Sequence, residues 1–110
     1  MTDKIVVLNT CASAEEAERL ARSLVDDRLA ACVTLINPVR SFYRWKGAVA
    51  DSMEWLLVIK TSRTLFGALR TAIESAHSYE VPEILALPVI EGSTNYLSWI
   101  DSELQSADID

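Results

Sequence analysis

Residues 76–83 bring together the side chains of this chain that are best suited to chemistry. The segment contains the only histidine, His77, followed by Tyr79, Glu80 and Glu83. An imidazole next to carboxylates can transfer protons, and in its neutral form it can bind copper or zinc. An ordinary polar loop has the same composition, so the elements that position these residues have to be considered as well.

His77 has a structural and a functional interpretation. It stands where a helical pattern ends, and there the helix dipole favours a protonated imidazole that caps the helix or forms an ion pair. The functional interpretation is a metal site formed by His77 with Glu80 or Glu83 as an oxygen ligand. Since native metal sites combine more convergent ligands, we predict at most a weak, exchangeable copper site.

The two cysteines have different surroundings. Cys11 follows the first predicted strand, where an exposed thiolate would bind Cu(I), and the alternative is a packed or merely exposed thiol. Cys32 lies in an apolar strand and is predicted to be a small core residue. Neither belongs to a CxxC or zinc-finger pattern, so we expect reduced thiols and a cytoplasmic protein.

Sequence motifs for catalysis are missing from the chain. There is no Ser/His/Asp set, no glycine-rich phosphate loop and no HExxH. We therefore predict that the protein is not an enzyme. The weaker alternative is acid–base catalysis by His77 and Glu83.

Length and charge narrow the class of protein. The 110 residues form one predicted domain, 1–110, and the formal net charge of −6 argues against nucleic acid as a partner. Arg40, Arg44 and Lys46 cluster around Phe42, but so few cations make only a weak basic surface. The first residues lack the pattern of a signal peptide, and no apolar run is long enough to cross a bilayer, so no membrane association is expected.

The first third of the chain reads as a strand followed by a helix. Residues 4–10 have the apolar, β-branched composition of a buried strand. Ser13 and Glu16 form a capping box, and the helix that begins there should end near residues 26–28. Its apolar stripe, with the spacing i, i+3, i+4 and i+7, consists of Ala17, Leu20, Ala21 and Leu24.

A long β-hairpin is predicted next. Residues 29–36 form an apolar extended run, and Pro38 indicates a bulge or an edge position because proline cannot donate to a neighbouring strand. The chain then alternates between two faces, one of which carries Arg40, Phe42 and Arg44 and the other Val39, Ser41, Tyr43 and Trp45. Residues 46–50 form the turn, and residues 53–60 form the returning strand.

A second helix, a fourth strand and a terminal helix complete the pattern. The helix is capped by Ser62 or Thr64 and ends near His77, and its apolar stripe consists of Leu65, Leu69, Ala72, Ile73 and Ala76. Residues 83–90 form the strand, and Ser93 caps the short terminal helix.

The order of these elements identifies the fold class. Strand, helix, strand, strand, helix, strand is the βαββαβ order of the ferredoxin-like sandwich, an α+β fold, here with a long hairpin and an added C-terminal helix. Right-handed crossovers place both crossover helices on one face of an antiparallel sheet. The acidic tail from Gln105 onward is predicted to fray.

The helix-free face of this sheet is predicted to be apolar. With helices on one face only, the strands should alternate between apolar and polar residues. They do not, because Cys32 and Ile36 point away from the apolar set of their strand and residues 55–59 include no polar residue. We therefore predict a homo-oligomer whose sheets face one another and whose hairpin reaches onto a neighbour. The alternative is that the terminal helix covers its own sheet.

Charged and aromatic residues predict a cleft between subunits. Glu83 begins the fourth strand and Lys60 ends the third, so the two can form an ion pair at a subunit boundary. The functional interpretation makes them the charged walls of a ligand cleft. Its predicted lining is Trp45, Tyr79, Tyr96 and Trp99. Aromatic residues also anchor interfaces, so a purely structural role is the alternative.

Five segments resemble the CutA divalent-cation tolerance family in their order and spacing. They are LAACVTLI at 29–36, SFYRW at 41–45, KT at 60–61, HSYEVPE at 77–83 and YLSW at 96–99. The similarity extends from about residue 5 to residue 104. It implies a ferredoxin-like homotrimer with the architecture of PII-type signalling proteins, whose trimers bind small effectors between subunits.

The resemblance also implies a role in tolerance of copper and other divalent metals. In a copper site proposed for a bacterial relative, the ligands are a cysteine in the first strand and two adjacent histidines. Asn9 stands at the cysteine position here, with Cys11 two residues further on. Ala76 and His77 replace the histidine pair and Ser78 replaces the proline that usually follows, so His77 is the one matching ligand.

Two hypotheses for the function follow. The first is a non-enzymatic homotrimer associated with divalent metal tolerance that binds Cu(II) weakly and needs no other cofactor. The alternative is a PII-like small-molecule sensor or signalling module, whose ligand lies between subunits among Lys60, Tyr79, Glu83 and Trp99.

Overall fold

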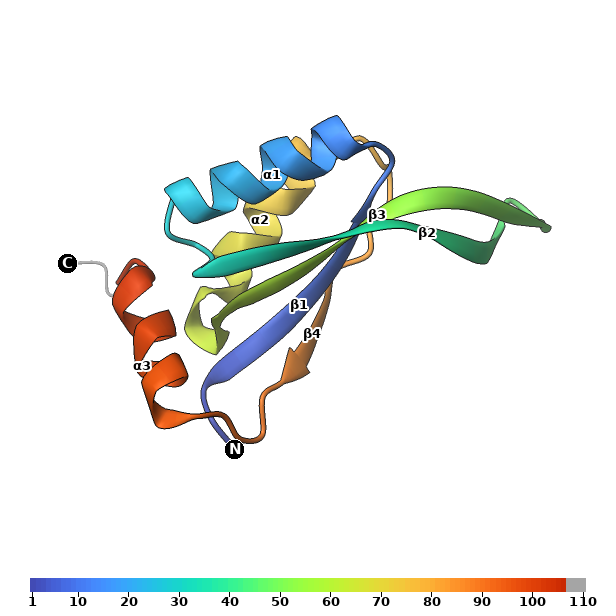
Figure 1. The fold of residues 1–110 in the computed structure, drawn as a ribbon. Coiled ribbons are helices and arrows are strands. Elements are labelled where there is room, and N and C mark those ends of the chain that lie inside the picture. The colour runs from blue at the N-terminus through green and yellow to red at the C-terminus, as the bar shows by residue number, and fades with distance from the viewer. Residues whose placement is uncertain (107–110) are drawn as a thin grey trace.

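Residues 1–106 fold into one four-stranded sheet and three α-helices (Figure 1). This computed structural model describes residues 1–106. The elements are β1 Lys4–Cys11, α1 Ala14–Asp26, β2 Cys32–Trp45, β3 Ala48–Ser62, a 3-10 turn Arg63–Leu65, α2 Phe66–Ala76, β4 Leu85–Pro88 and α3 Thr94–Glu103. The strands lie in the order β2-β3-β1-β4, and all neighbours are antiparallel. The predicted ferredoxin-like α+β fold is confirmed.

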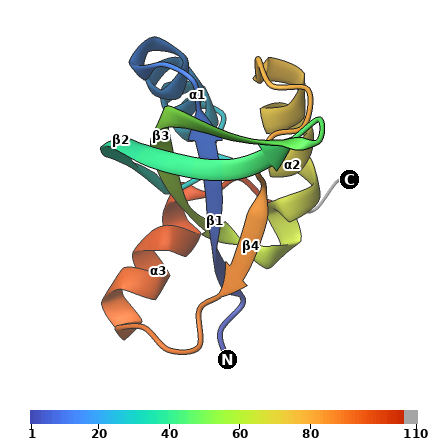
Figure 2. The same cartoon turned by 90° about the vertical axis from the view of Figure 1, so that its right-hand side faces the viewer.

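The crossover helices α1 and α2 lie side by side on one face of the sheet (Figures 1 and 2). Alternate residues of β1 and β3 point toward them and form the core. The largest apolar side chains that are fully buried there are Val7, Leu24, Leu57, Ile59, Leu69 and Ile73. The predicted stripe of α1 is part of this core, with Ala21 half-buried and the other three residues buried.

The N-terminus of α1 differs from the predicted capping box. Ser13 is the N-cap, and its Oγ accepts a hydrogen bond from the backbone N–H of Glu16 at 3.1 Å, as expected. The side chain of Glu16 does not return to Ser13, however. It accepts hydrogen bonds from Ala12 and Ser78, because the loop after α2 packs against this end of the helix.

The hairpin is longer and its turn is tighter than the sequence indicated. The strand predicted to begin at residue 29 begins at Cys32, because residues 29–31 are a buried connection. The turn consists only of Lys46 and Gly47, with φ of 51° and 84°. Two successive positive φ values give the turn twist that matches paired strands, so β3 begins at Ala48 rather than at residue 53.

The predicted irregularity at Pro38 is a β-bulge on an edge strand. Ile36 pairs with Leu56 and Val39 with Glu54, so β2 contains one extra residue between these pairs. Because residues alternate between faces, the extra residue turns Val39 and the odd-numbered residues after it to the same face as Glu54. The bulge therefore brings Tyr43 and Trp45 to the helix-free face of the sheet.

Two predictions about the second half of the chain are wrong in detail. Neither Ser62 nor Thr64 caps α2 with its side chain, because a 3-10 turn precedes the helix and Leu65 is its N-cap. The strand predicted for residues 83–90 is shortened to β4, since the chain before it loops past the end of β1. The Ser93 cap of α3 is confirmed, with its Oγ 3.3 Å from the backbone N of Tyr96.

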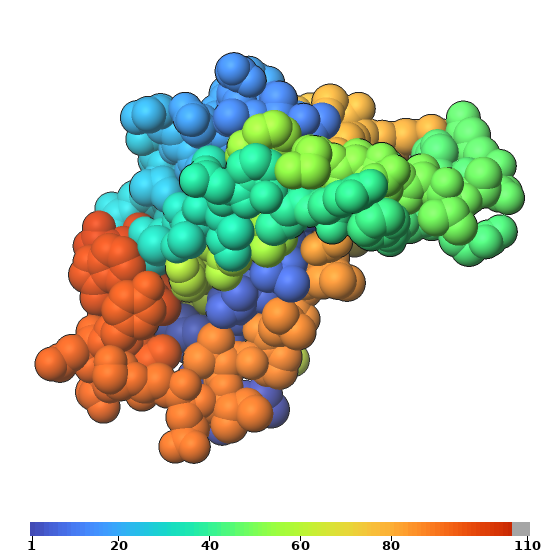
Figure 3. All heavy atoms as spheres, turned by 45° about the vertical axis from the view of Figure 1, so that its right-hand side comes forward, coloured from blue at the N-terminus to red at the C-terminus, as the bar shows by residue number. Residues whose placement is uncertain are grey.

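The terminal helix α3 covers only one end of the helix-free face. Ile100 is buried there, and the ammonium of Lys4, 3% exposed, pairs with Asp3 and with Asp101 at 2.7 Å. Further along this face Ile36, Leu85 and Leu87 are 41, 57 and 48% exposed. Figure 3 shows α3 at one end of the molecule and the hairpin projecting at the other. One helix thus leaves most of the apolar face open.

The remaining observations concern the C-terminal end and membranes. The acidic tail that was predicted to fray lies largely outside the described residues, although Gln105 itself donates hydrogen bonds to the carbonyls of Arg28 and Asp27. In the described part of the chain, no helix has the length and apolar character needed to span a bilayer.

Candidate functional site

His77 is held in a single tautomer at the C-terminal end of α2. Its side chain is 0% exposed. Nε2 lies 2.8 Å from the carbonyl oxygen of Thr10, and Nδ1 lies 3.1 Å from the backbone N of Tyr79. Since a carbonyl only accepts and an amide N–H only donates, Nε2 carries the proton and Nδ1 is the acceptor. These two hydrogen bonds connect β1 to the loop after α2 through the His77 ring.

Glu16 fastens the same loop to the N-terminus of α1. One carboxylate oxygen accepts from the backbone N of Ser78 at 2.7 Å, and the other from Ser78 Oγ at 2.9 Å and the backbone N of Ala12 at 3.4 Å. His77 Nδ1 is 3.8 Å away. Burial alone would raise the pKa of Glu16, but the hydrogen bonds from Ser78 and Ala12 lower it below its ordinary value.

Cys11 is the last residue of β1 and is fully buried, which corrects the prediction of a thiol beyond the strand. Its Sγ donates to Asn9 Oδ1 at 3.5 Å and lies 3.8 Å from His77 Nε2. Burial, and then the negative charges of Glu16 and Glu54, raise the pKa of the thiol to about 12. The sulfur is therefore a protonated thiol at neutral pH rather than the thiolate that binds metals.

The predicted copper ligands do not form a preformed metal centre. Both ring nitrogens of His77 are engaged, and Cys11 is protonated. Glu80 lies on the lining of a neighbouring pocket. Among residues 1–106, no group of three or more His, Cys, Asp or Glu side chains is arranged to hold a metal ion. Coordination by His77 would require one of its two hydrogen bonds to break.

Cys32 is not the core residue that its apolar strand suggested. It is half-exposed on the helix-free face of β2, directly opposite Lys60. Lys60 Nζ lies 3.8 Å from Cys32 Sγ and 2.7 Å from Thr34 Oγ1. α3 packs against β3 at this end of the sheet. Burial and the nearby Cys32 raise the pKa of Tyr96 on this helix.

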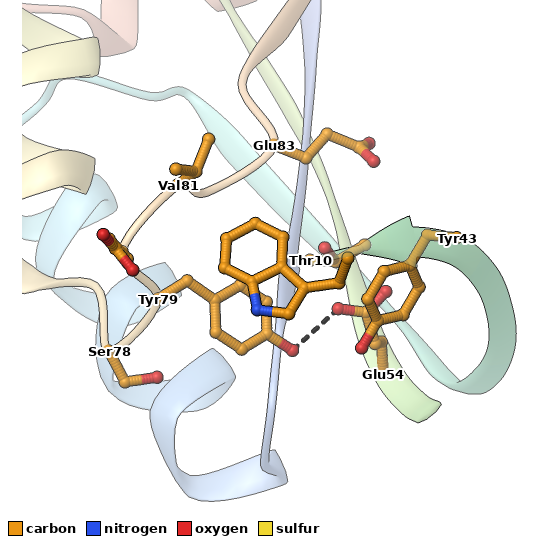
Figure 4. Close-up of a pocket in the computed structure, with 9 residues that line it drawn as sticks. Thr10, Tyr43, Glu54, Ser78, Tyr79, Val81 and Glu83 are labelled. Atoms are coloured by element: carbon orange, nitrogen blue, oxygen red, sulfur yellow. Dashed lines mark hydrogen bonds between the residues drawn. The ribbon is translucent and has the colours of Figure 1, made fainter. Parts of the chain in front are cut away.

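A pocket of about 420 Å³ lies at the opposite end of the helix-free face, between the hairpin and the loop after α2 (Figure 4). β1 contributes Thr10, the hairpin contributes two aromatic residues and Glu54, and the loop contributes the remainder. Its lining is Thr10, Tyr43, Trp45, Glu54, Ser78, Tyr79, Glu80, Val81 and Glu83. Three of the lining residues carry carboxylates and three carry aromatic rings, and none of them is a cation.

Glu54 is the most deeply buried carboxylate of this pocket. It is 7% exposed and accepts a hydrogen bond from the hydroxyl of Tyr79, whose oxygen lies 2.7 Å from Oε2 (Figure 4). Burial and this bond to an anion raise the pKa of Tyr79. Within the described part of the chain, Glu54 forms no ion pair at or below 4.0 Å. Sequence reasoning missed Glu54, because it lies in a strand pattern without a local polar motif.

The chain brings only some of the predicted cleft residues together. Trp45, Tyr79 and Glu83 line the pocket. Lys60 is opposite Val6 on β1, whereas the carbonyl of Glu83 accepts from the side chain of Asn9, three positions further along that strand. The predicted Lys60–Glu83 pair is therefore not formed within one chain.

The other two predicted cleft residues, Tyr96 and Trp99, lie at the end of the face that carries Lys60, not at the pocket. Tyr96 and Trp99 stack on each other on α3, with ring centroids 5.6 Å apart. They are 44 and 43% exposed. The predicted cleft is thus split into two groups at opposite ends of the helix-free face.

Comparison with known proteins identifies the family. Residues 5–103 match the model of the CutA1 divalent ion tolerance protein. The chain is 45% identical over 95 residues to the divalent-cation tolerance protein CutA of Thermus thermophilus, covering 86% of this chain and 92% of that protein.

Solved structures agree with this match. A structure of the divalent cation tolerance protein (Cut A1) from Thermus thermophilus superposes with a TM-score of 0.91 at 42% identity, covering 93% of this chain and 99% of that one. A periplasmic divalent cation tolerance protein CutA from Archaeoglobus fulgidus gives a TM-score of 0.90 at 35% identity, with 93 and 99% coverage. The match covers nearly the whole chain in both sequence and fold, and the chain belongs to the CutA1 divalent ion tolerance family.

Proposed function

We propose that this protein acts in divalent metal tolerance as a non-enzymatic homotrimer. The observation that supports the assembly is the helix-free face, where Ile36, Leu85 and Leu87 are about half exposed although α3 covers only one end. Soluble monomers rarely leave such a continuous apolar patch in water. Copies of the chain would cover it if their sheets faced one another, and the projecting hairpin would extend the contact onto a neighbour (Figure 1).

The mass in solution tests this assembly. Sedimentation equilibrium of the full chain at micromolar concentration should give three times the mass of one chain. A stable species with the mass of a single folded chain would contradict the proposal.

Copper binding, if it contributes to tolerance, should be weak and centred on His77. Cys11 and Glu80 are the sulfur and oxygen ligands predicted with it. In this geometry the metal competes with the hydrogen bonds that His77 makes to Thr10 and Tyr79, and binding to Cys11 would also have to remove a thiol proton. Calorimetric titration with Cu(II) should therefore give a low affinity that is lost in His77→Ala. Identical isotherms for the two proteins would exclude His77 as a ligand.

We assign the protein to the cytoplasm because its two cysteines are free thiols. Disulfides are the usual state of cysteine pairs in oxidising compartments. Fractionation of cells that produce the full-length protein would test this assignment.

The second candidate is a PII-like small-molecule sensor, and the pocket favours it. A concave space of about 420 Å³ with aromatic walls and a few convergent carboxylates has the character of a ligand site. A thermal-shift screen of metabolites distinguishes the two functions. A compound that raises the melting temperature in the presence of a metal chelator supports sensing, and stabilisation by metals alone supports the first candidate.

A further inference from the structure

We propose that α3 is a strap that opens as a unit while the sheet and the other two helices stay folded, and that Lys4 and Arg28 act as clamps that hold it closed. The closed helix covers one end of the helix-free face, and the open helix would leave that end accessible. Opening is a property of a single chain, so it does not depend on the proposed assembly. Within residues 1–106, the polar contacts that fasten α3 to the rest of the chain lie near its C-terminal end.

The apolar contact of α3 with the rest of the chain is small. Ile100 is buried, whereas every other residue from Thr94 to Glu103 is exposed or half-buried. The rings of Tyr96 and Trp99 stack on each other and remain 44 and 43% exposed. Figure 2 shows the helix apart from α1 and α2. A helix of 10 residues is not stable alone in water, so α3 depends on the few contacts that fasten it.

The chain just before α3 provides a hinge. Val89 follows β4 and is tied to the N-terminal segment, since its N–H donates to the carbonyl of Lys4 and its carbonyl accepts from Thr2. Residues 90–92 then lie exposed outside any helix or strand. The N-cap Ser93 accepts a hydrogen bond from α3 itself, so this bond would move with the helix. Rotation within residues 90–92 would therefore release α3 without breaking a hydrogen bond of the sheet.

The first clamp is the ammonium of Lys4 on β1. It is 3% exposed and pairs with Asp101 in the last turn of α3 at 2.7 Å, and with Asp3. Burial alone would lower the pKa of Lys4, but its hydrogen bonds to Asp101 and Asp3 raise it, so the side chain is charged. Opening of α3 separates this ammonium from one of its two carboxylates, which favours the closed helix.

The second clamp is the guanidinium of Arg28, just after α1. Its Nε donates to the carbonyl of Glu103 at 2.9 Å, and its Nη2 donates to the carbonyl of Ser102 at 2.6 Å. The last carbonyls of a helix have no donors within the helix, and the helix dipole favours a cation beside them. The backbone N–H of Gln105 also donates to the carbonyl of Arg28 at 2.8 Å, which fixes the chain where it leaves α3.

The backbone conformation of Arg28 supports a role for its side chain. Its φ is 59°, in the left-handed region that commonly follows a helix and that favours glycine. A residue with a side chain is strained there, and such a conformation persists where the surrounding structure imposes it. Glycine would therefore suit the end of α1 better, whereas arginine is the residue that can cap the end of α3.

Hydrogen exchange of the full-length chain tests the strap. The amides of residues 98–103 should exchange through an opening that depends only weakly on urea, because the release of one helix exposes little surface. The amides of β3 should instead require the much larger exposure of global unfolding. If both sets of amides had the same urea dependence, the helix and the core would unfold together, and the proposed strap would be wrong.

Two variants test the clamps. Lys4→Met should speed the exchange of α3 about tenfold, since it removes a charge-assisted hydrogen bond from a buried site. The two carboxylates that it leaves are 64 and 65% exposed and remain solvated. Arg28→Gly should speed the exchange of α3 about fivefold. The exchange of β3 by global unfolding should change less in this variant, because glycine relieves the strained backbone after α1.

Lys46→Gly is the matched control for Arg28→Gly. Among residues 1–106, Lys46 is the other non-glycine residue with a positive φ, at 51°, and it lies in the hairpin turn at the opposite end of the molecule from α3. Its substitution also removes a cation and relieves a left-handed backbone, so it should leave the exchange of α3 unchanged. If α3 exchanged no faster in Arg28→Gly than in Lys46→Gly, Arg28 would not be a clamp. A wild-type rate in Lys4→Met would exclude Lys4 in the same way.

Discussion

Glu16 and Glu54 are two carboxylates that are both 7% exposed but have opposite surroundings. Glu16, on the helix-covered side, accepts hydrogen bonds from Ala12 and from the backbone and side chain of Ser78, and lies next to His77. Glu54, on the helix-free side, accepts from the hydroxyl of Tyr79. Equal burial therefore does not mean equal compensation of the charge.

The different surroundings of Glu16 and Glu54 show on which side of the sheet a buried carboxylate finds its hydrogen-bond donors within one chain. On the helix-covered side, the donors to Glu16 join α1 to the loop after α2, and His77 joins the same loop to β1. On the helix-free side, a poorly compensated carboxylate lies beside exposed aromatic and aliphatic side chains. The first region stabilises the monomer fold, whereas the second has the features of an interface.

The largest effect is expected from a charge on the helix-free face. Leu87→Glu, at a residue 48% exposed on β4, should convert the assembly into single chains, because each interface would then bury an unpaired carboxylate. Sedimentation velocity over a range of concentrations measures this. Val25→Glu on α1, where the native residue is 41% exposed on the helix-covered side, is the control and should leave the mass unchanged. If both variants had the same mass in solution, the helix-free side could not be distinguished from the helix-covered side as the interface.

A smaller effect should distinguish the two carboxylates. In the Leu87→Glu background, where folding is not linked to association, Glu16→Gln should lower the free energy of unfolding by about 2–3 kcal/mol, because an amide accepts poorly in place of a carboxylate with several donors. Glu54→Gln should change it by less than about 1 kcal/mol, since an amide oxygen can still accept from Tyr79 and a buried charge is removed. Urea denaturation measures both.

The exposed neighbour Glu15 provides the control for that comparison. Glu15→Gln removes a carboxylate from the same helical turn without touching the loop after α2, so its effect should stay within about 0.5 kcal/mol. Losses of similar size at Glu16 and Glu54 would show that the hydrogen bonds to Glu16 do not set its energetic role.

The fold was predictable because its signals are local and agree with one another. The stripe that begins at Ala17, the Ser13 cap and the alternation around Phe42 each depend on near neighbours in the sequence. The bulge on the edge strand β2 was also predicted correctly, from the position of Pro38. Boundaries were less accurate where tertiary contacts decide them, as at Cys32. The buried connection before it is held to β3 by single hydrogen bonds, from Ala31 N to Lys60 O and from Thr61 Oγ1 to Leu29 O.

The site was predicted only in part because its contacts are long-range. Glu16 had an obvious local role as half of a capping box, and nothing near it in the sequence indicates that Ser78 displaces that role. His77 was identified from its residue type, but its buried, doubly bonded state depends on Thr10 and Tyr79. No local sequence motif around Glu54 indicates a functional role. Its importance arises from the fold, which places it under Tyr79.

The smallest predicted effect is a pH dependence that originates on the helix-covered side. The pKa of Glu16 is lowered from its ordinary value of 4.5 by its hydrogen bonds, so the folded state binds this proton less tightly than the unfolded state. The resulting stabilisation is fully present above the unfolded pKa and is lost as the pH falls through the folded pKa. Asp3, whose pKa is lowered mainly by a hydrogen bond from Lys4, contributes in the same acidic range.

The Glu16→Gln variant isolates the contribution of Glu16, because Asp3 is unchanged in it. The difference in unfolding free energy between the parent and this variant should be constant above about pH 6 and should shrink below about pH 4.5, by at most about 1.4 kcal/mol per pH unit. Urea titrations between pH 3 and 7 in the Leu87→Glu background measure it. A difference for Glu16 that stays constant throughout would mean that the folded protein does not hold its carboxylate in the charged form.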